Sequence, residues 1–222
     1  MNTYGIVGAG GYGREVIPLV AARFKEALSS GSATLYFVVE GAVEESEING
    51  YSVISLDEFL NLPGNRYFSI AIGQSAVRER IAALCEDRGA EAFSVFAENT
   101  VILDANEIAE GAVLSPFVTI TSNVKIGRHF HANIYSYVAH DCVIGDFVTF
   151  APSVKCNGNV IIEDHAYIGT GASIIQGKKG KPLTIGRGAV VGMGAVVTKS
   201  VAAGVTVVGN PARPLSREGL RK

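Results

Sequence analysis

Aliphatic or small apolar side chains recur at every sixth position between residues 102 and 174. The series is Ile102, Ile108, Leu114, Ile120, Ile126, Ala132, Val138, Ile144, Phe150, Cys156, Ile162, Ile168 and Ile174, and it resumes as Ile185, Val191, Val197 and Ala203. This period fits neither an amphipathic helix nor the alternation of a simple strand. It is typical of a hexapeptide β-helix.

In such a β-helix each short strand points one aliphatic residue inward, and a tight turn follows. Three hexads make one coil, and coils stack at about 4.8 Å. Side chains eighteen residues apart, such as Ile126, Ile144 and Ile162, are therefore predicted to lie above one another. Glycines that follow the inward residues, including Gly127 and Gly145, are expected to permit the turns. Such repeats normally coil left-handed, so a left-handed parallel β-helix is expected.

The first hundred residues follow a different pattern, in which short apolar runs alternate with amphipathic segments. We predict strands near residues 4–7, 35–39, 67–72 and 92–96, and helices over 14–28 and 75–88, the second capped by Ser75. Alternating strands and helices indicate a small Rossmann-like parallel sheet. The predicted domains are 1–98 (α/β, nucleotide-sugar-binding), 99–209 (β-helix, acyltransferase) and 210–222 (C-terminal tail).

Composition narrows the class of protein. The 222-residue chain has a formal net charge of −2, so no basic surface indicates nucleic acid as a partner. Cys85, Cys142 and Cys156 have no paired spacing and are expected to be buried, reduced thiols. The first residues lack signal-peptide features, and no apolar run reaches about eighteen residues. We therefore expect a cytoplasmic protein that does not insert into membranes.

A glycine-rich segment lies between the first strand and the first helix. Gly8, Gly10 and Gly13 fit the GxGxxG spacing, and Glu40 follows the second strand. Such a turn allows backbone N–H groups and a helix N-terminus to approach a diphosphate. A nucleotide-diphosphate sugar, a dinucleotide cofactor or a purely structural turn each fits the motif. The domain has room for one mononucleotide-binding half, whereas dinucleotide sites usually need two.

His140 and Asp141 are adjacent, and the hexad register places His140 outside the core near a corner. A carboxylate beside an imidazole fixes its tautomer and raises its basicity, as a general base requires. A solvated surface histidine is the alternative. A zinc site with His129, His131 or His165 would need three ligands to converge on one metal. Their spacing does not favour it, and no metal is expected.

The hexad pattern breaks at Gln176–Pro182, which displaces the register by five residues. This segment is predicted to leave the β-helix as a loop. Its lysines, with Lys199 nearby in sequence, could meet the phosphates of coenzyme A. A solvated basic loop remains the alternative.

Five segments carry a resemblance to a known family. They are GIVGAGGYGREV (5–16), IGQSAVRERI (72–81), HDCVIGDF (140–147), KCNGNV (155–160) and VVGNPARPL (207–215). Together they make the whole chain resemble the PglD and NeuD sugar O- and N-acyltransferases, bacterial enzymes that acetylate nucleotide-activated amino sugars or sialic acids.

The resemblance implies a role for particular residues. His140 is implied as catalytic base, Asp141 as the group that polarises it, and Gly158 as the oxyanion donor. The nucleotide-sugar would lie against Gly8, Gly10, Gly11, Tyr12, Gly13, Glu40 and Gly73. The acetyl-CoA cosubstrate would meet Gly158, Asn159, Gly177, Lys178, Lys179 and Lys199. Related proteins are homotrimers with active sites between neighbouring β-helices.

The sequence departs from the family pattern at two positions. Relatives often carry a second histidine nine residues beyond the first, where this chain has Thr149. UDP-sugar-binding relatives tend to end the second strand with two aspartates, where this chain has Val39 and Glu40. The nucleotide base therefore stays open between UDP, dTDP and GDP.

The expected function is acetyl-CoA-dependent N-acetylation of a nucleotide-linked amino sugar, such as a 4-amino-4,6-dideoxysugar, for surface polysaccharide or glycan synthesis. Three alternatives remain: O-acetylation of sialic acid or another sugar, a zinc-dependent protein similar to γ-carbonic anhydrase, and a non-catalytic nucleotide-binding scaffold.

Overall fold

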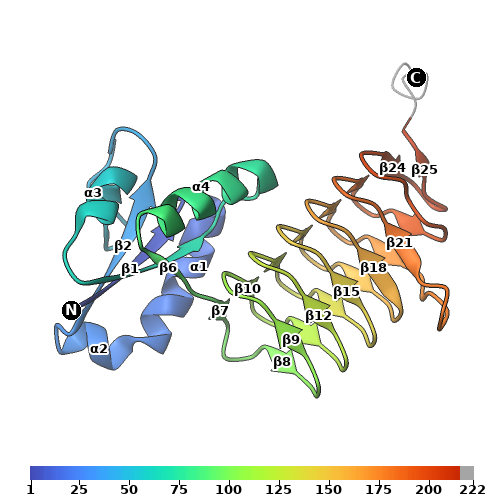
Figure 1. Ribbon diagram of the computed structural model, residues 1–222, viewed down its shortest axis with the longest axis horizontal. Coiled ribbons are helices and arrows are strands. Elements are labelled where there is room, and N and C mark those ends of the chain that lie inside the picture. Colours follow the sequence, from blue (N-terminus) through green and yellow to red (C-terminus); the bar gives the residue numbers. More distant parts are fainter. Residues whose placement is uncertain (216–222) are drawn as a thin grey trace. The chain divides into compact units, whose positions relative to one another are not determined.

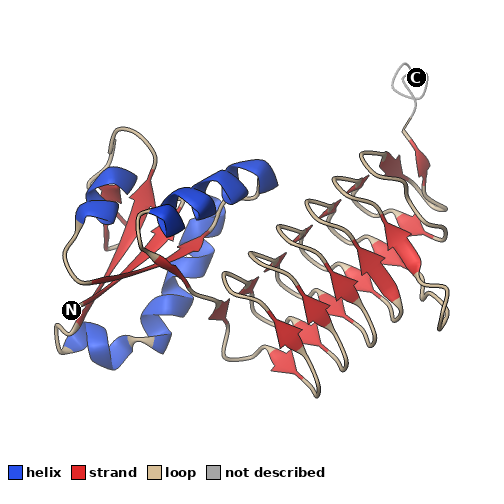
Figure 2. Ribbon diagram, viewed as in Figure 1, coloured by secondary structure: helices blue, strands red, loops and turns tan. Residues whose placement is uncertain are grey.

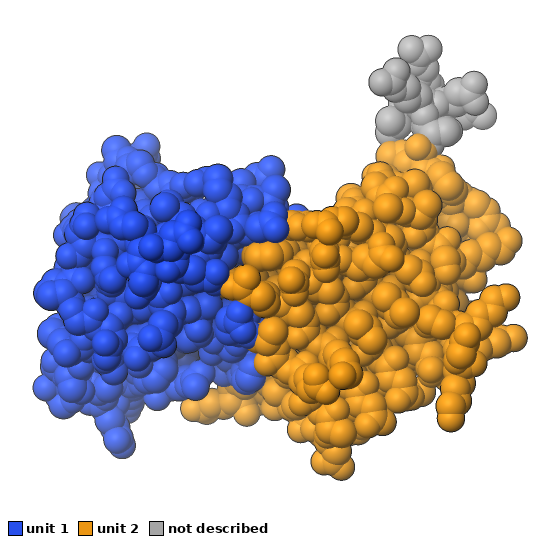
Figure 3. Space-filling model, viewed as in Figure 1, with its two compact units in different colours: residues 1–96, 110–113 blue, residues 97–109, 114–222 orange. Residues whose placement is uncertain are grey.

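A computed structural model of the protein describes residues 1–215. The chain divides into two compact units, residues 1–96 with 110–113 and residues 97–109 with 114–222 (Figure 3). The predicted tail, 210–222, is described as far as Leu215, and residues 216–222 lie outside the described part.

The first unit is a twisted sheet with helices packed on it (Figures 1 and 2). Its strands are β1 (Asn2–Val7), β2 (Ala33–Val39), β3 (Glu47–Ile48), β4 (Tyr51–Ser55), β5 (Asn65–Ile70) and β6 (Glu91–Ala92), in the order β3-β4-β2-β1-β5-β6. Neighbouring strands pair in parallel, except that β3 pairs antiparallel with β4. The helices are α1 (Gly11–Arg23), α2 (Lys25–Ser29), α3 (Leu56–Asn61) and α4 (Ser75–Asp87).

The two faces of β1 are covered by different helices. Ile6 packs in one buried cluster with Val16 and Val20 of α1. Gly5 points to the opposite face, where a Cβ would come within 2.8 Å of the Phe59 ring of α3. Because successive strand residues point to opposite faces, the sheet is buried on both sides at its centre. The carboxyl ends of β1 and β2 carry the predicted glycine loop and Glu40.

Several details of this unit differ from the sequence prediction. Ser75 does not cap α4: Gln74 is the N-cap, no side-chain cap bond forms, and Ser75 is the first helical residue. The predicted helix over 14–28 is divided at Phe24, whose ring stacks on Tyr4 with 4.2 Å between centroids. The β3–β4 hairpin and α3 were not predicted, because these elements are too short for a clear hydrophobic period.

The strands after β6 form three sheets, which are the walls of a left-handed parallel β-helix (Figures 1 and 2). One wall contains β7 (Val95–Phe96), β10 (Val113–Leu114), β13 (His131–Ala132), β16 (Thr149–Phe150), β19 (Tyr167–Ile168), β22 (Val190–Val191), β24 (Thr206–Val208) and β25 (Arg213–Pro214). Another contains β8 (Val101–Ile102), β11 (Thr119–Ile120), β14 (Tyr137–Val138), β17 (Lys155–Cys156), β20 (Ser173–Ile174) and β23 (Val196–Val197). The third contains β9 (Glu107–Ile108), β12 (Lys125–Ile126), β15 (Val143–Ile144), β18 (Val160–Ile162) and β21 (Leu183–Ile185).

The predicted stacking of side chains eighteen residues apart is confirmed. Ile126 pairs with Ile108 and Ile144, and Ile144 pairs with Ile162. Burial of each such side chain contributes about 1.5–3 kcal/mol. Ile162 then pairs with Ile185, twenty-three residues later, because the predicted loop adds five residues to this coil.

The turns are made by a column of residues rather than by the glycines predicted for them. Every sixth residue from Ala105 to Gly171 has a positive φ, and most are not glycine. Gly127 and Gly145 have no positive φ; a Cβ on either would instead collide with the Asp146 or Asp164 carboxylate of the next coil. The prediction for these glycines was therefore wrong in its cause: close approach of coils, not turn conformation, requires them.

The prediction of an inward side chain is also wrong for the first and the last residue of the series. Ile102 is 38% exposed, because β8 is the edge strand of its wall. Ala203 is exposed, and Val201 occupies the expected place by pairing with Ile185. The coil after Ile185 is two residues shorter than the eighteen-residue repeat, so the period fails there.

Candidate functional site

His140 and Asp141 form a hydrogen-bonded pair at a corner of the β-helix. The His140 Nδ1 lies 2.8 Å from the Asp141 Oδ2, and their side chains are 48% and 49% exposed. Asp141 is one of the positive-φ corner residues, at 59°, a conformation that Asp and Asn tolerate better than most side chains. The corner thus places the carboxylate beside the outward imidazole, which leaves Nε2 for proton transfer.

The main chain on both sides of this pair is fixed to neighbouring coils. The Asp141 N–H donates to the Ser122 carbonyl of the preceding coil at 3.1 Å. The His140 carbonyl accepts from the Asn159 N–H of the following coil at 3.0 Å. The imidazole therefore projects from a turn that is held from two sides.

Gly158 lies directly beneath the His140 ring. A Cβ built on Gly158 would be 2.5 Å from His140 Cε1 and 2.6 Å from Nε2, distances that no real Cβ contact shows. Only glycine allows the imidazole to occupy this place. The sequence-predicted base and oxyanion residues, eighteen residues apart, are therefore in contact.

The turn formed by residues 157–159 leaves one main-chain group unpaired. Asn157 N–H donates to the Ile174 carbonyl, Gly158 C=O accepts from Gly177 N–H, and Asn159 C=O accepts from Leu183 N–H. The Asn157 carbonyl accepts from the Cys142 thiol at 3.2 Å. Within residues 1–215 the Gly158 N–H donates to no protein acceptor. A donor of this kind, beside an imidazole, is available to an anionic oxygen.

The predicted acetyl-CoA residues fall into two places. Gly158, Asn159 and Gly177 lie together, because Gly177 N–H donates to the Gly158 carbonyl at 2.9 Å. From there the loop extends as a small hairpin in which Lys178 and Lys181 pair their main chains, and Lys178 and Lys179 are exposed. Lys199 lines a separate cavity of about 390 Å³ together with Arg213 at the carboxy-terminal coils.

The glycines of the loop in the first unit differ in whether a side chain would fit at their position. A Cβ on Gly13 would collide with the Gly8 carbonyl oxygen, so close packing of α1 on β1 requires glycine there. Gly10 is the N-cap of α1, and at Gly10 and Gly11 a Cβ would meet no atom within 4 Å. No acidic residue lies in the first turn of α1. The N–H groups at this end can therefore face an anion.

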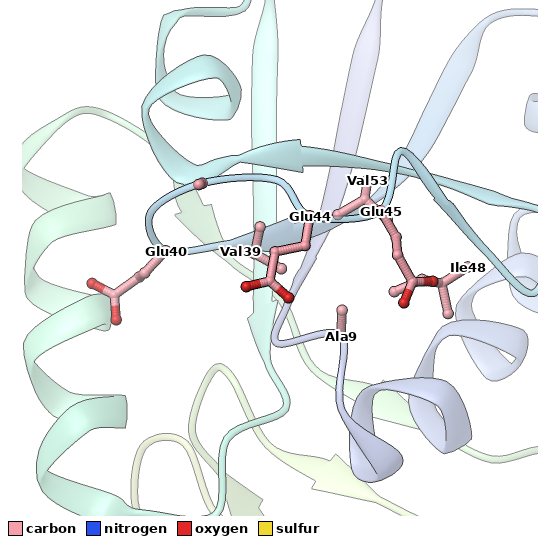
Figure 4. A pocket seen from close by; sticks show the side chains of 8 residues that line it. Ala9, Val39, Glu40, Glu44, Glu45, Ile48 and Val53 are labelled. Atoms are coloured by element: carbon pink, nitrogen blue, oxygen red, sulfur yellow. The ribbon is translucent and has the colours of Figure 1, made fainter.

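A cavity of about 290 Å³ lies at the carboxyl ends of β1 and β2 (Figure 4). Its apolar lining comes from Ala9, Val39, Ala42, Ile48 and Val53. The Glu44 and Glu45 side chains reach over it, whereas Glu40 points away from them (Figure 4). Glu40 accepts a hydrogen bond from Arg80 of α4 at 2.7 Å, so its carboxylate is already paired.

Comparisons with known proteins agree with this architecture. The family model described as the PglD N-terminal domain matches residues 5–84. A GDP-perosamine N-acetyltransferase of Escherichia coli O157:H7 is 52% identical over 218 residues, which is 98% of each chain. The chain belongs to the PglD/NeuD-type family of sugar acyltransferases.

Solved structures of this family resemble the protein over nearly its full length. WeeI from Acinetobacter baumannii AYE has a TM-score of 0.92 and 57% identity, covering 97% of this chain and 100% of its own. The acetyltransferase domain of PglB from Neisseria gonorrhoeae FA1090, in complex with acetyl coenzyme A, has a TM-score of 0.81 and 26% identity, covering 96% and 98%.

This PglD/NeuD-type acyltransferase places the other histidines away from His140. His129 stacks on Phe147, which stacks on His165, and these three belong to another corner of the β-helix. His131 and Thr149 are buried. Among residues 1–215 no group of three His, Cys, Asp or Glu side chains could hold a metal ion. All three cysteines are free and buried, as predicted.

Sequence reasoning missed several residues around the site. Glu44 and Glu45 were overlooked because they follow no strand directly, although a run of carboxylates after the second strand was visible. Arg78 lies in the recognised segment at 72–81, but nothing indicated that it is buried and donates to the Ile72 carbonyl at 2.8 Å. Burial lowers the pKa of Arg78 to about 10.

In the described range no helix is both long and apolar enough to span a membrane.

Proposed function

We propose that this protein transfers the acetyl group of acetyl-CoA to the amino group of a GDP-linked amino sugar, with GDP-perosamine as the first substrate to test. The observation that carries the proposal is 52% identity over 98% of both chains with an enzyme named for that reaction. At that level of identity, without large insertions, the substrate class is expected to be shared. The product would be an acetamido sugar for a surface polysaccharide.

His140 is proposed as the base in this reaction. When its Nδ1–H donates to Asp141 at 2.8 Å, Nε2 carries the free lone pair. The sugar amine attacks the thioester carbon, and its nitrogen must lose a proton as the C–N bond forms. Nε2 accepts that proton, and the Asp141 carboxylate stabilises the imidazolium.

Gly158 is proposed to stabilise the tetrahedral intermediate. Its N–H is the unpaired donor of the turn at residues 157–159, and it adjoins the ring that removes the proton. The developing oxyanion would accept from this N–H; loss of such a donor costs about 10²–10³ in rate. The C–S bond then breaks, and the coenzyme A thiolate can take the proton from His140. The sequence of steps needs no covalent enzyme intermediate.

The cavity between Ala9 and Glu45 is proposed to hold the guanine base. Its apolar lining suits the faces of a purine, and Glu44 and Glu45 supply acceptors at its edge. Guanine presents adjacent N1–H and N2–H donors that one carboxylate accepts together, whereas uracil and thymine offer a single imide N–H. Glu40, which the sequence placed against the nucleotide-sugar, is bound by Arg80, so Glu44 and Glu45 are proposed as the contacts to the base in its place.

The diphosphate is proposed to lie at the N-terminus of α1, against Gly8, Gly10, Gly11, Tyr12 and Gly13, with Gly73 near the same edge of the sheet. The N–H groups of a helix N-terminus and the helix dipole favour an anion there. The thirteen-residue length of α1 makes that dipole effective.

Acetyl-CoA is proposed to bind along Gly158, Asn159 and Gly177, with Lys178, Lys179 and Lys199 facing its phosphates. We further propose a homotrimer in which this groove lies between neighbouring β-helices, and a cytoplasmic location, where acetyl-CoA is available. Sedimentation would measure the oligomeric state.

One assay tests the proposed reaction. Release of coenzyme A thiol is followed with GDP-perosamine, UDP- and dTDP-linked 4-amino-4,6-dideoxysugars and free sialic acid, and the product mass is checked for one added acetyl group. We expect the highest kcat/KM with GDP-perosamine. Glu45→Gln and Glu44→Gln should raise the KM of GDP-perosamine but not that of acetyl-CoA, while the exposed Glu91→Gln leaves both unchanged. Equal turnover with UDP- and GDP-linked sugars would reject the guanine assignment.

A further inference from the structure

Asn157, the residue before Gly158, has both ends of its side-chain amide bound. The Tyr137 hydroxyl donates to Asn157 Oδ1 at 2.9 Å, and Asn157 Nδ2 donates to the Ile174 carbonyl at 2.8 Å. Tyr137, Asn157 and Ile174 lie on three successive coils. These two bonds therefore tie the turn at residues 157–159 to the coil on either side of it.

The direction of the Gly158 N–H follows from a third bond. The Asn157 carbonyl and the Gly158 N–H belong to one planar trans peptide, so they point in opposite directions. The carbonyl accepts from Cys142, a thiol with no exposed surface, at 3.2 Å. Because the carbonyl points at the interior of the β-helix, the N–H points away from it, towards the side where His140 projects.

We propose that Tyr137, Asn157 and Cys142 form a brace that positions the Gly158 N–H for oxyanion stabilisation. None of the three need touch substrate; they are positioning residues that act through the peptide. The inference rests on the proposed function, because an oxyanion forms only in acyl transfer. Burial raises the pKa of Tyr137, so its hydroxyl keeps the proton that the brace requires.

The preceding hexad provides a matched control. Ser136 has the same relation to Ala151 that Cys142 has to Asn157: its hydroxyl donates to the carbonyl fifteen residues later, at 3.0 Å. Residue 152 is proline, so the peptide after Ala151 has no N–H to position. The Ser136 hydroxyl also accepts from the Val154 N–H at 3.1 Å. Ser136→Ala therefore removes the equivalent coil-to-coil bond and this second one, at a peptide that has no oxyanion donor.

The first experiment compares Cys142→Ala, Cys142→Ser and Ser136→Ala. Cys142→Ala removes the hydrogen bond to the Asn157 carbonyl, and the loss of a bond of this strength is expected to lower kcat about threefold to tenfold. Both KM values should change less than about twofold, since ground-state binding is not affected. Cys142→Ser, which keeps a donor, should recover kcat. Ser136→Ala should lower the Tm at least as much as Cys142→Ala, because it also removes the acceptor of the Val154 N–H, but it should keep wild-type kcat.

The second experiment is a cycle of Tyr137→Phe and Asn157→Ala. Each should lower kcat, and the double variant should be no slower than Asn157→Ala alone, because the two residues act as one unit. Tyr167→Phe is the control. Tyr167 occupies on β19 the outward position that Tyr137 occupies on β14, and its hydroxyl bonds to no residue in the range 1–215. Its kcat should equal that of the wild type.

Each outcome separates the brace from the proposed function. Wild-type kcat in both Cys142→Ala and Asn157→Ala would refute the brace, as would an equal kcat loss in Ser136→Ala. A wild-type enzyme without turnover would refute the function instead. The brace would then be judged by hydrogen exchange: the Asn159 N–H should exchange at least about tenfold faster in Cys142→Ala than in Ser136→Ala, and equal exchange in the two variants would reject it.

Discussion

The His140 imidazole occupies the space in which a side chain at Gly158 would begin, with 2.5 Å between His140 Cε1 and the position of that Cβ. One residue supplies a ring and the other supplies the room for it, although eighteen positions separate them in the chain. The contact arises because one eighteen-residue coil of the β-helix brings residue 158 next to residue 140. It places a proton acceptor and an unpaired N–H side by side.

Gly158→Ala should displace the His140 ring, because the new methyl cannot fit beneath it. We expect kcat to fall by about 10² or more, while His140→Ala/Gly158→Ala should be no worse than His140→Ala alone. Gly171→Ser is a control for the β-helix, since it has open space and Ser153 has the same positive φ one coil earlier. If the kcat losses of His140→Ala and Gly158→Ala multiplied in the double variant, His140 and Gly158 would not act through the same contact.

His140→Ala should lower kcat by about 10²–10⁴ with acetyl-CoA affinity retained. Asp141→Asn should cost less, because asparagine also accepts the positive φ of this corner and can still hold the ring. Steady-state kinetics and calorimetric titration with acetyl-CoA measure the two effects. A larger loss for Asp141→Asn than for His140→Ala would reverse the assigned roles.

Gly10→Ala and Gly13→Ala should separate ligand contact from packing in the glycine loop. A methyl at residue 10 meets no protein atom, so the Tm should stay unchanged while the KM for the nucleotide sugar rises about tenfold or more. A methyl at residue 13 collides with the Gly8 carbonyl, so Gly13→Ala should lower the Tm. An unchanged KM in Gly10→Ala would make the loop structural only.

Ile144→Asp should unfold the β-helix, because it places a charge between Ile126 and Ile162 in a side chain now 2% exposed. The cost of burying an unpaired carboxylate is at least several kcal/mol. Val143→Asp is the control on the same strand: Val143 points outward, and its neighbour Lys125 already pairs there with Glu107 at 2.9 Å. Thermal unfolding followed by circular dichroism should show loss of the transition only for Ile144→Asp.

The native protein should not react with a thiol reagent at about pH 8. All three cysteines are buried, and burial raises the pKa of Cys85 to about 12, whereas hydrogen bonding with Cys156 lowers the pKa of Cys142. Exclusion of the reagent from the interior, and not a raised pKa, therefore protects Cys142. Denaturation should expose three thiols per chain. Rapid labelling before denaturation would contradict the buried positions of the three cysteines. If no labelling occurs, the thiol released in the acetyltransferase assay comes from coenzyme A alone.

The six-residue period predicted the β-helix because each coil repeats one local geometry. Ile126, Ile144 and Ile162 could be placed in one stack by counting alone. The same counting failed at Ala203, where the coil is two residues shorter than the repeat. It also failed at Ile102, because β8 is the edge strand of its wall. In the first unit the period gave the main helices and strands, but not the short β3–β4 hairpin or the break at Phe24. The single strand predicted near residues 92–96 was wrong: the chain there forms β6 and β7, which belong to different sheets.

The sequence by itself determined the repeat, the glycine loop and the adjacency of His140 and Asp141, because each is a local pattern along the chain. Only the tertiary structure decided that His140 lies over Gly158, that Glu40 is held by Arg80, and that Tyr137 and Cys142 reach Asn157. These contacts join residues from different coils or different elements. Their geometry depends on how the backbone stacks and on which space a neighbour leaves open, and no residue's own identity specifies that.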